Sequence, residues 1–74
     1  MVVRGYCVEV EPLSEVGAAG WLGRVPDLPG CISDGDDLVL LEANVAEAIE
    51  TWISAAHRLG RDIPSPTLAP APRP

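Results

Sequence analysis

Several residue types on which catalytic and metal sites depend are scarce in this 74-residue chain. It has no Phe and no Lys, only two Cys and one His, and aromatic residues make up 4% of it. A zinc site uses four ligands at short paired spacings, and a catalytic triad needs a base beside its nucleophile. Cys7, Cys31 and His57 are instead single residues far apart along the chain. We therefore predict no metal, no cofactor and no enzymatic activity.

Positive charge is also scarce, because five Arg stand against eleven acidic residues and the net charge is -6. Affinity for DNA or RNA comes largely from cationic side chains that neutralise phosphates, so direct nucleic-acid binding by this chain is not expected. The same negative charge would steer a basic protein partner toward the chain.

Long apolar runs are missing as well. No stretch approaches the roughly 20 residues that span a bilayer, and no basic segment followed by an apolar run marks a secretory signal. We therefore expect a soluble protein of the cytoplasm without membrane contact, in which Cys7 and Cys31 are reduced and mostly buried. A chain this short buries only about 60% of its unfolded surface on folding, so a partner subunit, most simply in a homo-oligomer, is expected to stabilise it.

Three short strands are predicted in the first half of the chain. Apolar and polar residues alternate from Val2 to Glu11, which is the period-two pattern of a half-buried strand. Residues 14–20 are rich in Gly and Ala and predict a flexible hairpin connection. Residues 21–25 then form a second strand, in which Gly23 indicates close packing, and residues 31–34 form a third. Strands joined in this way make an antiparallel meander.

The link between the second and third strands is predicted to be a tight, stiff turn. Pro26 and Pro29 fix their own φ angles, and Gly30 is free to adopt a positive φ. We assign these residues a structural role.

A long helix is predicted from about Asp37 to Leu59. Asp36 and Asp37 suit its N-cap and first turn, and Gly60 suits its C-cap. This capping role is favoured over a divalent-cation site formed together with Asp34. Apolar residues at spacings of three and four trace one face of the helix: Leu38, Leu41, Val45, Ala48, Ile49, Trp52, Ala56 and Leu59.

Further apolar residues of the helix lie off that face: Val39, Leu40, Ala43, Ala46 and Ile53. One interpretation is ordinary exposed surface, because folded surfaces are more than half apolar. The other is contact with a second subunit or a partner. Together these elements predict the α+β class, with a three-stranded antiparallel meander packed on one long helix.

The end of the chain has a different composition. Residues 64–74 are rich in proline, which favours extended polyproline II conformation and excludes a central strand. We expect residues 1–63 to form the folded domain and residues 64–74 a mobile tail. Residues 63–68 are a possible fourth strand at the edge of the sheet.

The sequence around the predicted turn resembles the signature of HicB-family antitoxins. The resembling segments are Val25–Asp36 (VPDLPGCISDGD), Gly20–Leu22, Glu42–Ala43, Glu47–Glu50 and Gly60–Pro64. The resemblance implies a partial ribonuclease-H-like fold without nuclease activity, which neutralises a small basic mRNA ribonuclease of the HicA type by masking its surface. Many HicB proteins also carry a C-terminal DNA-binding domain. Only proline-rich residues follow Pro64 here, so operator binding is not expected.

The predicted toxin contacts combine exposed acids near the sheet and the helix start with apolar anchors. They are Glu9, Glu11, Trp21, Leu28, Asp34 and Asp36. The alternative function is a stand-alone homo-oligomeric scaffold or regulator, whose apolar surface serves self-association only.

Overall fold

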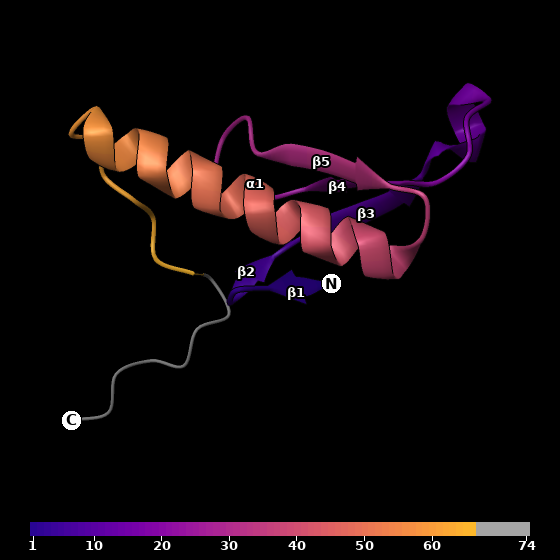
Figure 1. The fold of residues 1–74 in the computed structure, drawn as a ribbon, viewed down its shortest axis with the longest axis horizontal. Helices are drawn as coiled ribbons and strands as arrows, with labels where there is room; N and C mark the ends of the chain where they lie inside the picture. The colour runs from indigo at the N-terminus through magenta and orange to yellow at the C-terminus, as the bar shows by residue number, and fades with distance from the viewer. Residues whose placement is uncertain (67–74) are drawn as a thin grey trace.

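A three-stranded antiparallel sheet and one long helix form the body of the computed structural model, which describes residues 1–66 (Figure 1). In chain order the elements are β1 (Val2–Val3), β2 (Tyr6–Cys7), β3 (Glu9–Pro12), the 3₁₀ helix η1 (Leu13–Val16), β4 (Trp21–Arg24), β5 (Ile32–Gly35) and α1 (Leu38–Arg58). Strands β3, β4 and β5 pair in that order, and β1 and β2 form a separate hairpin. The predicted α+β class, a three-stranded meander packed on one helix, is confirmed.

The first predicted strand is interrupted by a tight turn. Arg4 and Gly5 have positive φ angles of 52° and 84°, and Val3 pairs with Tyr6 across them. Positive φ at both central residues is the signature of a two-residue type I′ hairpin, whose twist matches that of the flanking strands. The prediction of a single strand from Val2 to Glu11 was therefore wrong. Val3 and Tyr6 face the same side although they are three residues apart, so the turn shifts the alternation by one residue. Val2 and Val3 are both apolar, so either phase fits the start of the chain and the pattern did not reveal the shift.

Beyond this turn the alternation places the residues as predicted. Tyr6 and Val8 are buried and Val10 is half-buried, whereas Glu9 and Glu11 are exposed. The inward residues join a core made of Val3, Tyr6, Val8, Val25, Leu28, Cys31, Leu41, Val45 and Ile49. These side chains fill the space between the sheet and α1.

Gly23 allows the helix to approach the centre of the sheet. A Cβ atom at this position would lie 2.9 Å from Cγ2 of Val45 and 3.2 Å from Cδ1 of Leu41. Both distances are shorter than ordinary van der Waals contact, so a side chain here would push α1 away from β4. The close packing predicted at Gly23 is present.

The helix begins and ends within one residue of its predicted bounds. The Asp37 carboxylate accepts a hydrogen bond of 2.7 Å from the backbone N–H of Leu40, which is the geometry of an N-cap. At the other end Gly60 has a φ of 68°, in the left-handed region that follows many helices. Leu41, Val45, Ile49 and Ala56 are the buried residues of the helix.

The turn between β4 and β5 is closed by short backbone hydrogen bonds. The N–H of Leu28 donates to the carbonyl of Val25 over 3.1 Å, and the N–H of Cys31 donates to the carbonyl of Leu28 over 2.9 Å. Gly30 has a φ of 84°, a value that favours glycine. The indole Nε1 of Trp52 donates to the carbonyl of Pro29 over 2.8 Å, so the helix holds the turn in place.

After the helix the chain runs back to the first hairpin (Figure 1). The hydroxyl of Tyr6 donates a hydrogen bond of 2.6 Å to the carbonyl of Pro64, and Pro66 lies against Gly5. Residues 61–66 form no strand. The rest of the possible fourth strand, and most of the proline-rich tail, lie outside the described residues.

Candidate protein-binding site

One face of the three-stranded sheet is not covered by the helix. Strand register sets its side chains in two rows, in which Glu9 lies beside Arg24 and Ile32, and Glu11 lies beside Leu22 and Asp34. Gly23 lies at the register position between these two rows, and a Cβ atom there would meet the helix. Because side chains alternate along a strand, the two rows point away from the helix. We call this surface the outer sheet face: Glu9, Glu11, Leu22, Arg24, Ile32 and Asp34.

The outer sheet face combines acidic side chains with two aliphatic ones. Glu9, Glu11 and Asp34 are exposed carboxylates, and Arg24 supplies the positive charge. Nη2 of Arg24 lies 3.8 Å from Oε1 of Glu11, and both side chains are about half exposed, so this pair contributes little to stability. Ile32 is 50% exposed. Acidic side chains beside partly exposed aliphatic ones are typical of a surface that a cationic partner covers.

The structure gathers some of the predicted contact residues and separates others. Glu9, Glu11 and Asp34 share the outer sheet face. Trp21 belongs to the opposite face, where it packs against the core, and Asp36 is exposed in the connection between β5 and α1.

Leu28 does not fit the role of a surface anchor. Its side chain is 0% exposed and belongs to the core. A leucine between two prolines and a glycine is expected to point outward from a loop, but the hydrogen bonds at Val25 and Cys31 fold this turn inward. The expectation that Leu28 contacts a partner was wrong for this reason.

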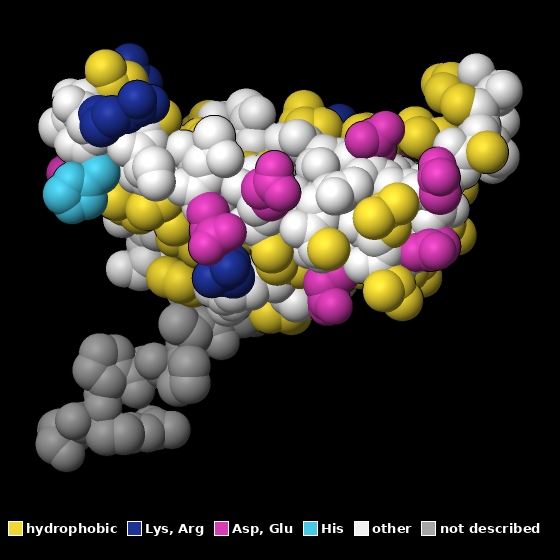
Figure 2. All heavy atoms as spheres, in the orientation of Figure 1, with side chains coloured by type: hydrophobic (Ala, Val, Ile, Leu, Met, Phe, Trp, Pro, Cys, Tyr) yellow, Lys and Arg dark blue, Asp and Glu magenta, His cyan; other side chains and the backbone are white. Residues whose placement is uncertain are grey.

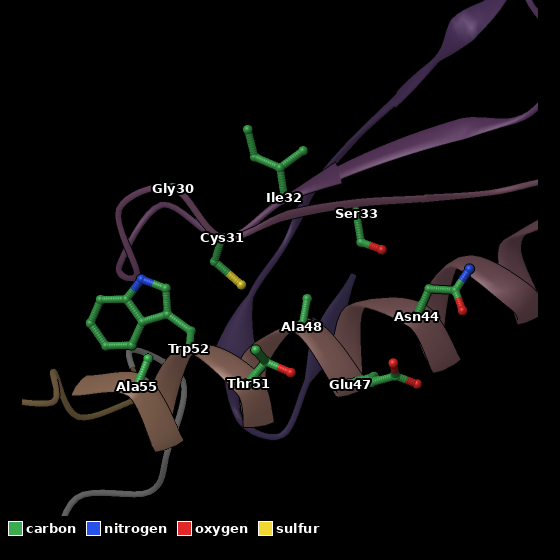
Figure 3. A pocket seen from close by; sticks show the side chains of 10 residues that line it. All are labelled: Gly30, Cys31, Ile32, Ser33, Asn44, Glu47, Ala48, Thr51, Trp52 and Ala55. Atoms are coloured by element: carbon green, nitrogen blue, oxygen red, sulfur yellow. The ribbon is translucent and has the colours of Figure 1, made fainter. Parts of the chain in front are cut away.

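A second surface, which sequence reasoning missed, is the groove between β5 and α1. It has a volume of about 620 Å³ and is lined by Gly30, Cys31, Ile32, Ser33, Asn44, Glu47, Ala48, Thr51, Trp52 and Ala55. Figure 3 shows Cys31 pointing toward the helix above Ala48, while Ile32 points away from it. The run of small side chains at Asn44, Ala48, Thr51 and Ala55, spaced three or four apart, was the signal in the sequence.

The groove is lined largely by small side chains, and it is mildly acidic. Within the part of the chain that the structure describes, its charged lining residue is Glu47 and no Arg or His side chain lines it. Its upper wall is the edge strand β5, and the side-chain Nδ2 of Asn44 donates a hydrogen bond of 2.7 Å to the carbonyl of Asp34. This contact ties the helix to the edge of the sheet.

Apolar side chains are also exposed near the helix start and the first hairpin. Val39 is 81% exposed and Val2 is 50% exposed. Together with Val3, Arg4, Glu42, Ala43 and Ala46 they line an open hollow of about 430 Å³ that we call the hairpin patch. Figure 2 shows apolar side chains interspersed with acidic ones over the helix side of the molecule.

The groups considered for catalysis are dispersed. Cys7 is exposed, so the expectation that both thiols are buried was wrong for Cys7, which lies on the outward side of β2. Cys31 is buried, and this burial raises the pKa of its thiol, which keeps it protonated and a poor nucleophile at neutral pH. His57 is exposed in the last helical turn. Among residues 1–66 no three His, Cys, Asp or Glu side chains gather as a group that could hold a metal ion.

No helix within residues 1–66 combines the length and the apolar character that crossing a bilayer requires.

Comparison with known proteins gives one match. A family model described as the HicB-like antitoxin of bacterial toxin–antitoxin systems matches residues 6–70, a range that includes every element from β2 to α1. No curated protein and no solved structure matches the chain. An antitoxin has a toxin as its partner, and its role is regulatory. The match covers most of the chain and confirms the predicted resemblance, so this protein belongs to the HicB-like antitoxins.

Proposed function

We propose that this chain binds and neutralises a small basic ribonuclease of the HicA type by covering the surface with which that toxin cleaves messenger RNA. The family match over residues 6–70 carries the proposal, because it makes a toxin the partner. We place the interaction in the cytoplasm and propose that the chain acts by binding alone, without catalysis. Its kinship with a partial ribonuclease-H-like fold, implied by the resemblance, is part of the same proposal.

The charge of the chain supports a cationic partner. At a net charge of -6 the protein repels nucleic acid and attracts a surface built to bind RNA. A toxin that holds RNA through Lys and Arg presents such a surface. Binding the antitoxin there would exclude RNA from the same side chains.

The outer sheet face is the proposed contact for this cationic surface. Glu9, Glu11 and Asp34 lie on it, and Asp36 follows directly after β5. Leu22 supplies apolar area between Glu11 and Asp34, and Ile32 supplies more beside Arg24. Trp21 lies on the other side of β4 and would support the face from beneath rather than touch the partner.

Charge reversal on this face tests the proposal. The variant Glu9→Lys/Glu11→Lys should bind the toxin with an association rate about tenfold lower and a dissociation rate changed much less, because rim charges act mainly on encounter. A matched variant, Glu15→Lys/Asp62→Lys, makes the same change in net charge at exposed positions away from the face. Surface plasmon resonance at several salt concentrations separates the two rates.

Equal slowing by both double variants would mean that net charge alone steers the toxin and that the outer sheet face has no special part. Absence of any binding by the unaltered chain would contradict the proposed function itself.

The alternative function, a self-associating scaffold or regulator without a toxin, is favoured by the hairpin patch. Exposed valines on two separate elements leave apolar area that a second copy of the chain would bury. We propose that the protein forms a homo-oligomer through this patch, also when it acts as an antitoxin.

Sedimentation velocity at micromolar concentration tests self-association. We expect the unaltered chain to sediment as an oligomer and Val39→Asp to sediment as a monomer, because the new carboxylate would be desolvated in the contact. Thr51→Asp, on another side of the same helix, is the control and should stay oligomeric. A monomeric unaltered chain would show that the exposed valines are ordinary surface.

A further inference from the structure

Strand β5 leaves one of its edges open. In the order β3-β4-β5 it is the terminal strand, and among the described residues it pairs with β4 alone. Residues 61–66, after the helix, do not cover it, because Pro64 is hydrogen-bonded to Tyr6 and Pro66 lies against Gly5 at the first hairpin. An edge strand with unpaired backbone groups is a template for another strand unless something blocks it.

Hydrogen bonds show which backbone groups face the open edge. The carbonyl of Cys31 accepts from Val25, so the backbone of Cys31 faces β4. The carbonyl of Asp34 accepts from Asn44 on the helix, so the backbone of Asp34 faces away from β4. Because residues alternate along a strand, Ile32 faces the open edge together with Asp34, and Ser33 faces β4. The N–H groups of Ile32 and Asp34 and the carbonyl of Ile32 therefore point outward.

The groove continues this edge on the helix side. Every second side chain of a strand added beside β5 would point toward α1, and the small residues Ala48, Thr51 and Ala55 leave room for it there. Glu47 lies in the lining of the groove and the exposed carboxylate of Asp34 lies on the outer sheet face, so an acid would stand near each face of such a strand. A second copy of this chain would bring its own Glu47 and Asp34 to the same place, where like charges repel.

We propose that an extended segment of the basic toxin binds at the open edge of β5 as a fourth strand, with small or apolar side chains in the groove and Lys or Arg beside Glu47 and Asp34. This inference rests on the proposed function and names a part of its interface. Backbone hydrogen bonds would supply affinity, and the groove and its acids would select the segment.

Amide hydrogen exchange followed by NMR tests this directly. The probe is an inactive variant of a basic HicA-type toxin. In the free protein the amides of Ile32 and Asp34 should exchange faster than that of Ser33, which lies toward β4. On addition of the probe we expect both outward amides to slow by about tenfold or more, as new hydrogen bonds protect them.

Two variants test the assignment of this edge as the binding site. Ile32→Pro removes an N–H that does not bond to β4, so the sheet should stay folded while toxin affinity falls about tenfold. Glu47→Arg should weaken binding more than the matched Glu15→Arg, which makes the same change at an exposed position of η1, outside the groove. Circular dichroism checks that each variant is folded.

The outcomes separate this inference from the function on which it rests. Binding of the probe without protection of Ile32 and Asp34, or with unchanged affinity of a folded Ile32→Pro variant, would overturn the edge site and leave the antitoxin function intact. Protection that appears at high concentration without the probe would assign the edge to a second copy instead. No binding at all would contradict the proposed function.

Discussion

At the scale of single residues, the turn between β4 and β5 depends on the conformation of Gly30. Its φ of 84° is costly for any residue with a branched Cβ, although nothing lies within 4 Å of the position that a Cβ would take. Gly30→Val should therefore lower the free energy of unfolding by about 1–2 kcal/mol through backbone strain alone. Urea denaturation measures the difference.

Gly30→Asn is the control, because Asn tolerates the left-handed region better than other residues do, and it should retain most of the stability. If the valine variant unfolds at the same urea concentration as the unaltered chain but binds the toxin poorly, Gly30 is a contact residue and not a structural one.

Sequence reasoning succeeded for residues whose surroundings are local and failed for those set by distant parts of the chain. The N-cap at Asp37 depends on groups a few residues away, so its position could be predicted. Leu28 is buried because the turn between β4 and β5 folds inward and Trp52 of α1 is hydrogen-bonded to it. These contacts come from residues distant in the sequence, so the residues around Leu28 do not predict them.

At the scale of elements, the segment after α1 is tied to the first hairpin through Tyr6. Burial, with a smaller contribution from the charge of Asp27, raises the pKa of Tyr6 above its ordinary value of 10.0. The unfolded chain therefore loses this proton at a lower pH than the folded chain does. The stability from neutral Tyr6 is complete below pH 10.0 and is lost as the pH rises through the folded pKa.

Tyr6→Phe removes both this proton and the hydrogen bond to Pro64. The variant should be less stable at neutral pH by about 1 kcal/mol, and it should lose less stability than the unaltered chain between about pH 9 and pH 11. Cys31, whose pKa burial also raises, is present in both proteins and cancels in the comparison. Parallel loss of stability in the two proteins, measured by urea denaturation across this range, would contradict the assignment.

Elements were predictable to different degrees. Helix α1 carries caps at both ends and a regular apolar face, and its predicted bounds were accurate. The hairpin at Arg4 and Gly5 was missed because its shift in the alternation falls beside two consecutive valines, Val2 and Val3, which fit either phase. The groove beside β5 was missed because it is formed between two elements, and a sequence read one element at a time does not show which flank of a helix faces an edge strand.

At the scale of the whole molecule, charge and shape complement each other. Within residues 1–66 the sheet is covered on one face only, and its open face carries acids, while β5 pairs on one edge only and Asp34 lies on that strand. A partner that covers both surfaces would contact the outer sheet face and extend the sheet at once. The family match names the class of this partner, and the net charge of -6 explains why it would be basic.

The central claim is that this chain neutralises a ribonuclease toxin, and cleavage of a messenger RNA by a HicA-type toxin tests it most directly. With an equimolar amount of this chain, cleavage should stop, and it should resume when the Glu9→Lys/Glu11→Lys variant replaces the unaltered chain at low concentration. The chain alone should neither cleave the RNA nor shift it in a gel at physiological salt, because its charge repels phosphate. Equally fast cleavage with and without an excess of this chain would contradict the account and favour the self-associating scaffold.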